Sequence, residues 1–278
     1  MVTPTVHRPT VPRASRSSAP RGPTVHPSGV SAPVCVFLSG IGAGPAAVSY
    51  RSLFGELETT GLRLIAKDLE IGATDPPQTS FTIRDEIDGL MRVDTGNAAG
   101  RMHLYGHSAG AAVALAFVAA YPERVATLAI DEPATDFSGE DLADPNWHEI
   151  ERALALPPDD AMTAFLVAQL APGVTPPRTR PPRPGLAKRP LVATFADAIR
   201  QHRIPRDRYA AYRGPVLYLY GSLSNQRWER MRERLARTFS DLMAERFAGL
   251  HHLNPPHVAE PARVARLLRT HWGRERAP

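Results

Sequence analysis

This chain is organised around the stretch Met102-His103-Leu104-Tyr105-Gly106-His107-Ser108-Ala109-Gly110-Ala111-Ala112-Val113-Ala114. Its first part is rich in aliphatic and aromatic residues and predicts a short strand, whereas the alanine-rich part predicts a helix that continues to Tyr121. Between them, Gly106-x-Ser108-x-Gly110 predicts a turn so tight that only small residues fit beside the serine. The turn would lift the Ser108 hydroxyl off a sheet and place it at a helix N-terminus, where backbone N–H groups favour negative charge.

The rest of the chain alternates between buried strands and helices. Apolar runs predict strands at 34–39, 62–67, 125–130, 215–221 and 244–247. The segments between them predict helices at 46–60, 82–94, 226–239 and 258–272. This alternation predicts right-handed crossovers and a mostly parallel, doubly wound α/β sheet. A functional site is then expected at the carboxyl ends of the strands.

Two segments interrupt the alternation. Residues 1–33 are rich in Pro, Ser, Thr and Arg without periodicity, which predicts a disordered tail. Between 137 and 213, a run rich in proline and arginine at 172–190, which predicts a linker, separates helical pieces at 146–155, 159–171 and 192–202. We therefore expect a core formed by 34–136 and 214–278, interrupted by the helical insertion 137–213.

Composition and charge limit the class of protein. The single cysteine, Cys35, excludes an intrachain disulfide framework and suits a reducing compartment. Apolar runs stay below the ~18 residues that a membrane helix needs, and the N-terminus lacks the apolar core of a secretory signal. The formal charge of +5 is concentrated in proline-rich segments without interleaved aromatic residues, unlike a nucleic-acid-binding surface. We expect a cytoplasmic protein with neither a nucleic-acid nor a membrane partner.

The strand–turn–helix around Gly106-x-Ser108-x-Gly110 resembles the nucleophile elbow of the α/β-hydrolases, and the resemblance extends from about Val34 to Trp272. It implies an α/β-hydrolase fold in which the segment 137–213 forms a small helical cap. Larger members of the family begin with two further edge strands. The residues before Val34 contain no convincing candidates for these strands, so the sheet is expected to start late.

The resemblance implies a serine, an acid and a histidine, in that chain order. Ser108 takes the place of the nucleophile. The histidine should lie between the last strand and the last helix, where His252 is preferred over its neighbour His251, which stays open as an alternative. His257 is expected to cap the helix or pair beside Glu260. His107, within the elbow, is expected to pack beneath the site without acting as a second base.

The position of the acid departs from the commonest family pattern. After the strand that ends at Gly221 there is no nearby carboxylate, and Ser224 in that loop is expected to cap the next helix. Some relatives, such as the haloalkane dehalogenases, carry the acid at the end of the preceding strand, and Glu132 falls on that position. Asp131 is the alternative, although an extended chain would point it to the other side. A serine nucleophile also disfavours the halide and epoxide chemistry of those relatives.

The remaining expectations concern the oxyanion and possible ligands. The resemblance implies that the backbone N–H groups of Ile41 and Ala109 stabilise the oxyanion. The glycine-rich turn 40–44 lacks the Lys-Ser/Thr of a phosphate-binding loop. The histidines between 251 and 257 have no carboxylate or cysteine near them in sequence that would complete a zinc site, so neither a metal nor a cofactor is expected.

These residues together predict a serine hydrolase. Ser108 would attack an ester, thioester or lactone of a small acyl substrate and form an acyl-enzyme, with His252 as base and Glu132 orienting it. The alternatives are an acyl transfer, cyclisation or lyase step on the same scaffold, and an inactive ligand-binding member. A carboxylate far from His252 would favour the binding role.

Overall fold

The computed structural model describes residues 32–42, 44–73, 80–96, 100–135, 145–176 and 188–275. They form a six-stranded sheet in the order β2-β1-β3-β4-β5-β6, in which every neighbouring pair is parallel. The strands are β1 (Val34–Leu38), β2 (Arg63–Lys67), β3 (Met102–His107), β4 (Val125–Asp131), β5 (Val216–Gly221) and β6 (Leu242–Phe247). The predicted parallel α/β sheet is confirmed, and within the described residues it begins at β1.

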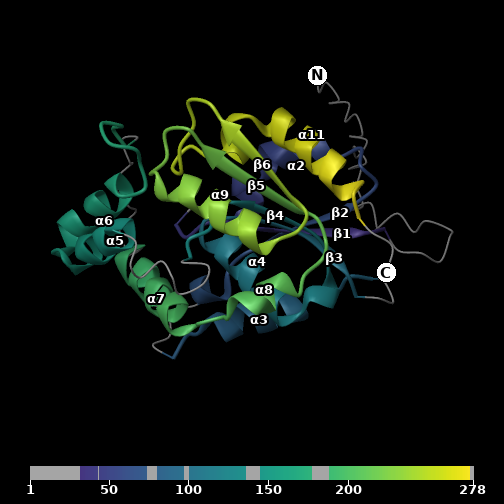
Figure 1. Ribbon diagram of the computed structural model, residues 1–278, viewed down its shortest axis with the longest axis horizontal. Helices are drawn as coiled ribbons and strands as arrows, with labels where there is room; N and C mark the ends of the chain where they lie inside the picture. Colours follow the sequence, from purple (N-terminus) through teal and green to yellow (C-terminus); the bar gives the residue numbers. More distant parts are fainter. Residues whose placement is uncertain are drawn as a thin grey trace, which may run out of the picture. The chain divides into compact units, whose positions relative to one another are not determined.

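Helices cover both faces of the sheet (Figure 1). The helices α3 (Ile83–Met91), α4 (Ala109–Ala120), α8 (Arg206–Ala210) and α9 (Arg227–Thr238) pack on one face. On the other face lie α1 (Ala46–Ser49), α2 (Arg51–Leu57), α10 (Pro256–Ala259) and α11 (Pro261–Trp272). Short 3₁₀ turns occur at Glu70–Gly72 and Pro122–Arg124. The sheet is therefore doubly wound.

Side-chain alternation along the strands divides the core into two clusters. In β1, Val34, Val36 and Leu38 face the side of α4, whereas Cys35 and Phe37 face the side of α2 and α11. All five are fully buried, as expected of a parallel strand that is covered on both faces. The four inner strands β1, β3, β4 and β5 are buried along their whole length, whereas the edge strands β2 and β6 are partly exposed.

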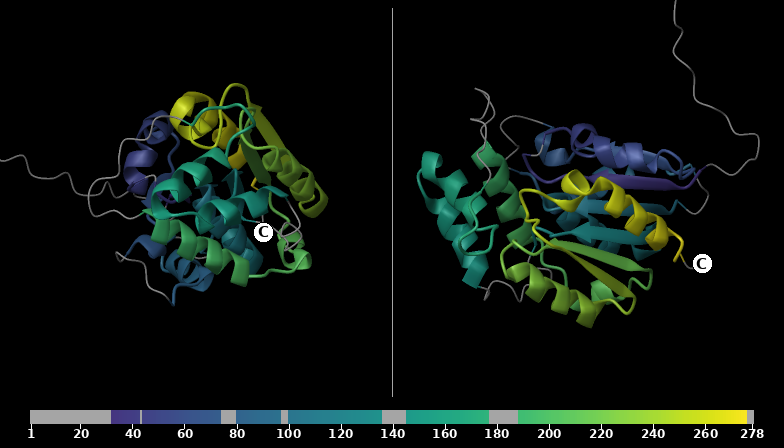
Figure 2. Two further views of the ribbon diagram at one scale, coloured as in Figure 1. Left: turned by 90° about the vertical axis from the view of Figure 1, so that its left-hand side faces the viewer. Right: turned by 90° about the horizontal axis from the view of Figure 1, so that it is seen from above.

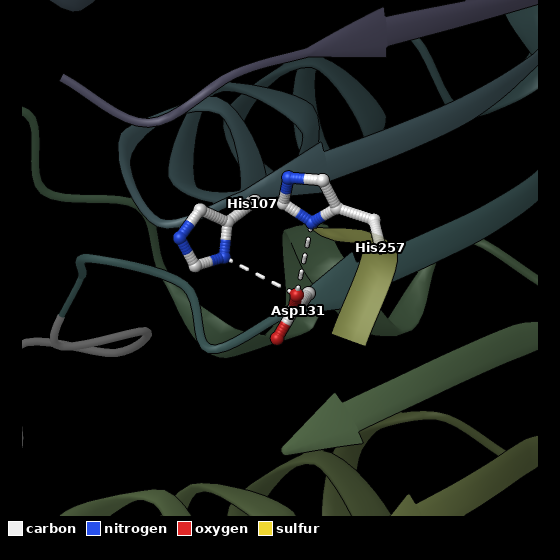
Figure 3. Close-up of side chains that lie close together, drawn as sticks. All are labelled: His107, Asp131 and His257. Carbon is white, nitrogen blue, oxygen red and sulfur yellow. Dashed lines mark ion pairs between the residues drawn. The ribbon is translucent and has the colours of Figure 1, made fainter. Parts of the chain in front are cut away.

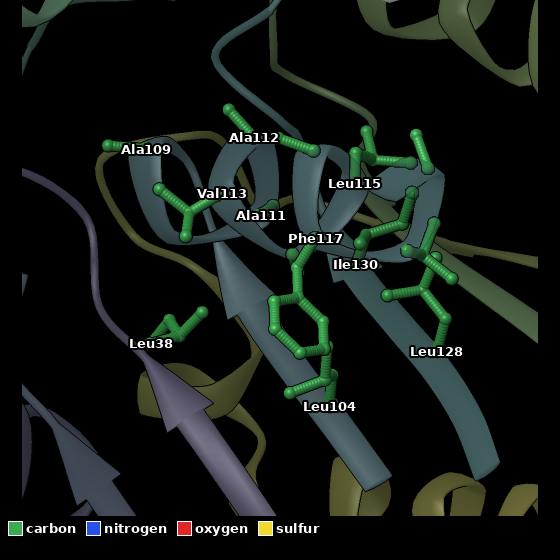
Figure 4. Close-up of a cluster of buried hydrophobic side chains, with 14 of the residues drawn as sticks. Leu38, Leu104, Ala109, Ala111, Ala112, Val113, Leu115, Phe117, Leu128 and Ile130 are labelled. Carbon is green, nitrogen blue, oxygen red and sulfur yellow. The ribbon is translucent and has the colours of Figure 1, made fainter. Parts of the chain in front are cut away.

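The helix α4 occupies the centre of the larger cluster (Figure 4). Every residue of α4 except Ala120 is buried, so the alanine-rich sequence serves close packing on the sheet as well as helix propensity. Figure 4 shows Val113 and Phe117 directed toward the strands that carry Leu38 and Leu104. The packing of α4 on the sheet therefore fixes the position of the turn at Ser108, which joins β3 to α4.

Two of the predicted helices are interrupted. The segment 258–272 is divided at Glu260 between α10 and α11, and the segment 46–60 is divided earlier in the chain. The segment 46–60 forms α1 and α2, separated at Tyr50, and ends at Leu57. Tyr50 leaves the helical conformation, with φ −96° and ψ 4°. Its buried hydroxyl donates a hydrogen bond to the carbonyl of Leu38 at 2.6 Å, and its ring packs against Phe37. This buried anchor explains a break that the helical sequence pattern does not reveal.

The helices α5 (Pro145–Ala155), α6 (Pro158–Val167) and α7 (Lys188–Gln201) lie beside the carboxyl ends of the strands (Figure 2). The predicted helix 159–171 ends early, because the residues after Val167 leave the helix and bond to the loop that follows β5. The backbone N–H of Ala171 donates to the carbonyl of Leu223 at 2.9 Å, and that of Asn225 to Gln169 at 3.0 Å.

Two predicted segments, the N-terminal tail and the linker, fall mostly outside the described residues. The predicted disordered tail lies outside them apart from residues 32 and 33, as does most of the linker at 172–190. Within the described residues, no helix has the length and apolar character needed to cross a membrane.

Candidate active site

Ser108 occupies a sharp turn between β3 and α4. Its backbone has φ 54° and ψ −118°, a left-handed conformation that costs a residue other than glycine on the order of 1–3 kcal/mol. A side chain at Gly106 would come within 2.5 Å of the carbonyl oxygen of Gly110, and one at Gly110 would collide with the carbonyl of Leu38. The glycines at both flanks are therefore required by close backbone approach.

This crowding predicts a large effect of one methyl group. Gly110→Ala is expected to destabilise the protein by about 3 kcal/mol, because backbone atoms of β1 have no room to move away. The matched control is Gly55→Ala in α2, where nothing lies within 4 Å of an added Cβ and the change should stabilise by about 0.5–1 kcal/mol. Urea unfolding measures both, and equal effects would contradict the close approach.

Three of the predicted site residues come together at the carboxyl ends of the strands. The Nε2 of His252 lies 3.0 Å from the Oγ of Ser108, and its Nδ1 lies 2.9 Å from an Oε of Glu132. Glu132 and His252 are buried. The arrangement is a serine, a histidine and a carboxylate in one hydrogen-bonded chain, which is the geometry of nucleophilic catalysis.

Glu132 is held by its backbone as well as by its side chain. It directly follows β4 and has φ 44°. Among the residues that the structure describes, it and Ser108 are the two non-glycine residues with positive φ. The second carboxylate oxygen of Glu132 accepts a hydrogen bond from the backbone N–H of Gly221 at 2.7 Å. Two adjacent strand ends thus fix the carboxylate that contacts His252.

The rival residues occupy other positions. Asp131 lies beside His107 and His257. The ring of His251 accepts a hydrogen bond from the backbone N–H of Leu253 at 3.2 Å, in the local turn of the loop. Neither therefore joins the hydrogen-bonded chain of the predicted triad.

His107, Asp131 and His257 form a second cluster of titratable groups (Figure 3). One oxygen of the buried Asp131 lies 3.2 Å from Nδ1 of His107 and 3.6 Å from Nδ1 of His257. The Nε2 of His257 lies 3.4 Å from the hydroxyl of Ser49. At these separations the carboxylate contacts both imidazoles directly.

The expectation that His257 pairs beside Glu260 is wrong, because its ring turns inward from α10 and Glu260 pairs with Arg263 instead. The expectation that no carboxylate joins these histidines also needs correction. The fold brings Asp131 to His107 and His257, with all three potential metal-ligand atoms within 4.8 Å of one another. The three side chains form a buried cluster in which the carboxylate of Asp131 can pair with an imidazole that is protonated.

Two further expectations concern loops at the site. Ala109 is the first residue of α4 and directly follows Ser108. The turn that contains Ile41 also lies close to Ser108, since a Cβ added at Gly40 would be 3.1 Å from the Cβ of Ser108.

The expected helix cap is wrong: Asn225, not Ser224, accepts a hydrogen bond from the first N–H of α9, at 3.0 Å. Ser224 is buried instead, and it lowers the pKa of Glu132.

Burial controls the charges of these groups. Burial, followed by the charge of Asp131, raises the pKa of Glu132 to about 8, although the N–H of Gly221 lowers it. Burial also lowers the pKa of His252 well below its usual value. Burial by itself would raise the pKa of Asp131, but His107 and His257 hold it at about 2. One charged carboxylate therefore lies next to one that resists ionisation.

Solved structures share this architecture. The carboxylesterase CesB from Bacillus subtilis is 19% identical over 86% of this chain and 83% of its own, with a TM-score of 0.59. A structure reported for carboxylesterases of Nitrososphaera gargenis is 19% identical over 88% and 91%, with a TM-score of 0.61. The Rv0554 protein of Mycobacterium tuberculosis is 16% identical over 88% and 92%, with a TM-score of 0.65. At these identities the likeness concerns the fold.

Sequence comparison identifies the family. No curated protein matches the chain. The sequence model of the Alpha/beta hydrolase family, however, matches residues 35–267, which include both glycines of the elbow and the serine, glutamate and histidine of the site. Since this match covers far more than half of the sequence, the chain belongs to the α/β-hydrolase family.

Proposed function

We propose that the protein is a serine hydrolase that cleaves an ester, thioester or lactone of a small organic molecule through an acyl-enzyme on Ser108. The observation that carries the proposal is the chain of hydrogen bonds from Ser108 through His252 to Glu132, at 3.0 and 2.9 Å. A serine hydroxyl is a poor nucleophile until an adjacent base accepts its proton. The carboxylate close to His252 argues against an inactive binding role.

The reaction would take place in two halves. The Nε2 of His252 accepts the proton of the Ser108 hydroxyl while its oxygen attacks the acyl carbonyl. The proton then passes to the leaving alcohol or thiol, whose bond to the acyl carbon breaks. Water, deprotonated by the same nitrogen, releases the acid and restores Ser108. Glu132 keeps the imidazole proton on Nδ1 throughout.

The surrounding backbone would stabilise the oxyanion and shield the site. The N–H of Ala109, at the start of α4, and that of Ile41 are the proposed donors, and loss of one such donor typically costs about 2.7–4 kcal/mol of barrier. The helices α5, α6 and α7 are proposed to form a cap over the strand ends, where they would exclude water and shape the acyl pocket. The substrate is accordingly proposed to be a small molecule.

The test is turnover of p-nitrophenyl esters with short and long acyl chains, of a thioester and of a lactone, with Ser108→Ala as control. Saturable hydrolysis by the wild type alone supports the proposal. If the wild type reacts with a fluorophosphonate but hydrolyses none of these compounds, the scaffold performs transfer, cyclisation or elimination. If it neither reacts nor hydrolyses, the binding role is correct.

The pH dependence follows from the shared titration of Glu132 and His252. The reactive form has an ionised Glu132 and a neutral His252, one proton fewer than the form that dominates below the Glu132 pKa of about 8. We therefore expect kcat/KM to fall roughly tenfold per pH unit below about pH 8 and to level off above it. The pH profile of ester hydrolysis measures this.

Asp131→Asn provides the matched variant for the profile. It removes the neighbouring charge that raises the pKa of Glu132, so its acid limb should lie at lower pH than that of the wild type. A wild-type limb near 6.5, the value of a free histidine, that does not move in Asp131→Asn would contradict this account.

A further inference from the structure

Trp228, on the first turn of α9, lies flat against the imidazole of His252. The two ring centroids are 5.3 Å apart and the planes differ by only 6°, whereas the ring of His107 also contacts His252 but is tilted by 39° at 5.0 Å. Trp228 is 2% exposed. The hydrogen bonds to Ser108 and Glu132 hold the two nitrogens of the imidazole, yet they leave its tilt about the line between them free. The indole restricts that remaining rotation.

The indole is in turn held from the helical segment. The guanidinium of Arg227 lies over the Trp228 ring, 4.3 Å from its centroid, and donates a hydrogen bond to the side-chain oxygen of Gln169. Gln169 follows α6, is 2% exposed, and donates from its amide to the carbonyl of Phe165 at 3.1 Å. A continuous set of contacts therefore runs from α6 through Arg227 to His252.

The same region is fixed by a second contact. The side-chain amide of Asn225 donates to the carbonyl of Ala168 at 3.2 Å, and its backbone N–H donates to the carbonyl of Gln169. Leu170 and Ser224 form a β-bridge between the two loops. The start of α9 is therefore attached to the end of α6, and the position of Trp228 depends on both.

We propose that Trp228 is a positioning residue for His252, and that Gln169 and Arg227 hold it in place from the helical segment. This inference rests on the proposed serine hydrolase function. When His252 takes the Ser108 proton it becomes an imidazolium, and an aromatic face stacked on a cation attracts it through the ring quadrupole. Trp228 thus favours the charged intermediate as well as the orientation of the neutral ring.

The test compares Trp228→Phe with Trp228→Leu. The rate constant of Ser108 phosphonylation by a fluorophosphonate and its half-saturating concentration are measured with the wild-type chain as reference. Loss of the aromatic face in Trp228→Leu is expected to lower the rate constant by about 2-fold to 30-fold, with the half-saturating concentration unchanged. Trp228→Phe should recover most of the rate. Trp272→Phe, at the far end of α11, is the control and should react like the wild type.

The same substitution made in a variant that lacks the imidazole distinguishes a positioning role of Trp228 from a merely structural one. In His252→Gln, where no imidazole remains, Trp228→Leu should leave the residual rate unchanged. Gln169→Ala should lower the wild-type rate by a smaller factor and have no effect once Trp228 is leucine. If Phe and Leu at position 228 lose equal rate, or if the loss persists without His252, Trp228 acts only through packing and the inference is wrong.

The outcome separates this inference from the proposed function. A wild type that does not react with the fluorophosphonate contradicts the hydrolase itself. A wild type that reacts, with a Trp228→Leu variant that reacts at the same rate while thermal unfolding shows it folded, contradicts the positioning role alone.

Discussion

Glu132→Gln is expected to lower kcat/KM by about 10⁴-fold. The glutamine amide would donate a hydrogen bond to Nδ1 of His252, which leaves the imidazole proton on Nε2, the atom that must accept the proton of Ser108. The carbonyl oxygen of glutamine can still accept the N–H of Gly221, so the fold should be retained. Steady-state hydrolysis of a p-nitrophenyl ester measures the loss.

Asp131→Asn is the control for Glu132→Gln. Asp131→Asn changes a group of the same kind one residue away, but Asp131 faces His107 and His257 rather than His252. Its kcat/KM on the plateau above pH 8 should therefore exceed that of Glu132→Gln by at least about 100-fold. If the asparagine variant is the more damaged of two folded proteins, the acid has been assigned to the wrong carboxylate.

Ser108→Ala is expected to lower kcat by about 10⁶-fold. This is the typical loss when the nucleophile of a catalytic triad is removed. The variant removes one hydroxyl from a turn in which alanine fits as well as serine, so its thermal unfolding should match the wild type. Progress curves at high enzyme concentration, run alongside Ser52→Ala on the exposed surface of α2, measure the difference. Comparable activity of Ser108→Ala and Ser52→Ala would exclude Ser108 as nucleophile.

Much of the fold follows from local sequence because its determinants are local. The apolar runs of β1 and β4 and the glycines at 106 and 110 depend on burial and on backbone space, which leave a direct pattern in the sequence. Glu132 could be singled out only through the resemblance to relatives that carry the acid after this strand, and Asp131 stayed open beside it. The break at Tyr50 could not, because a buried tyrosine in a helical pattern looks like any other core residue.

The neighbours of the site are harder to predict, because they depend on contacts between distant segments. Trp228, Met231 and Leu235 are spaced so that they lie on one face of α9, which is a pattern typical of core packing. Nothing in this spacing indicates that Trp228 contacts His252. The cluster of Asp131 with His107 joins two adjacent strands through register that only the folded sheet fixes.

The most direct measurement is intact mass after treatment with a fluorophosphonate. One phosphonyl group is expected to be added per wild-type chain, peptide mapping should place it on Ser108, and Ser108→Ala should gain none. Addition in Glu132→Gln should be much slower, because its imidazole carries the proton on the wrong nitrogen. A well-folded wild type whose mass does not change, or whose added group lies on another serine, would show that Ser108 is not the activated nucleophile.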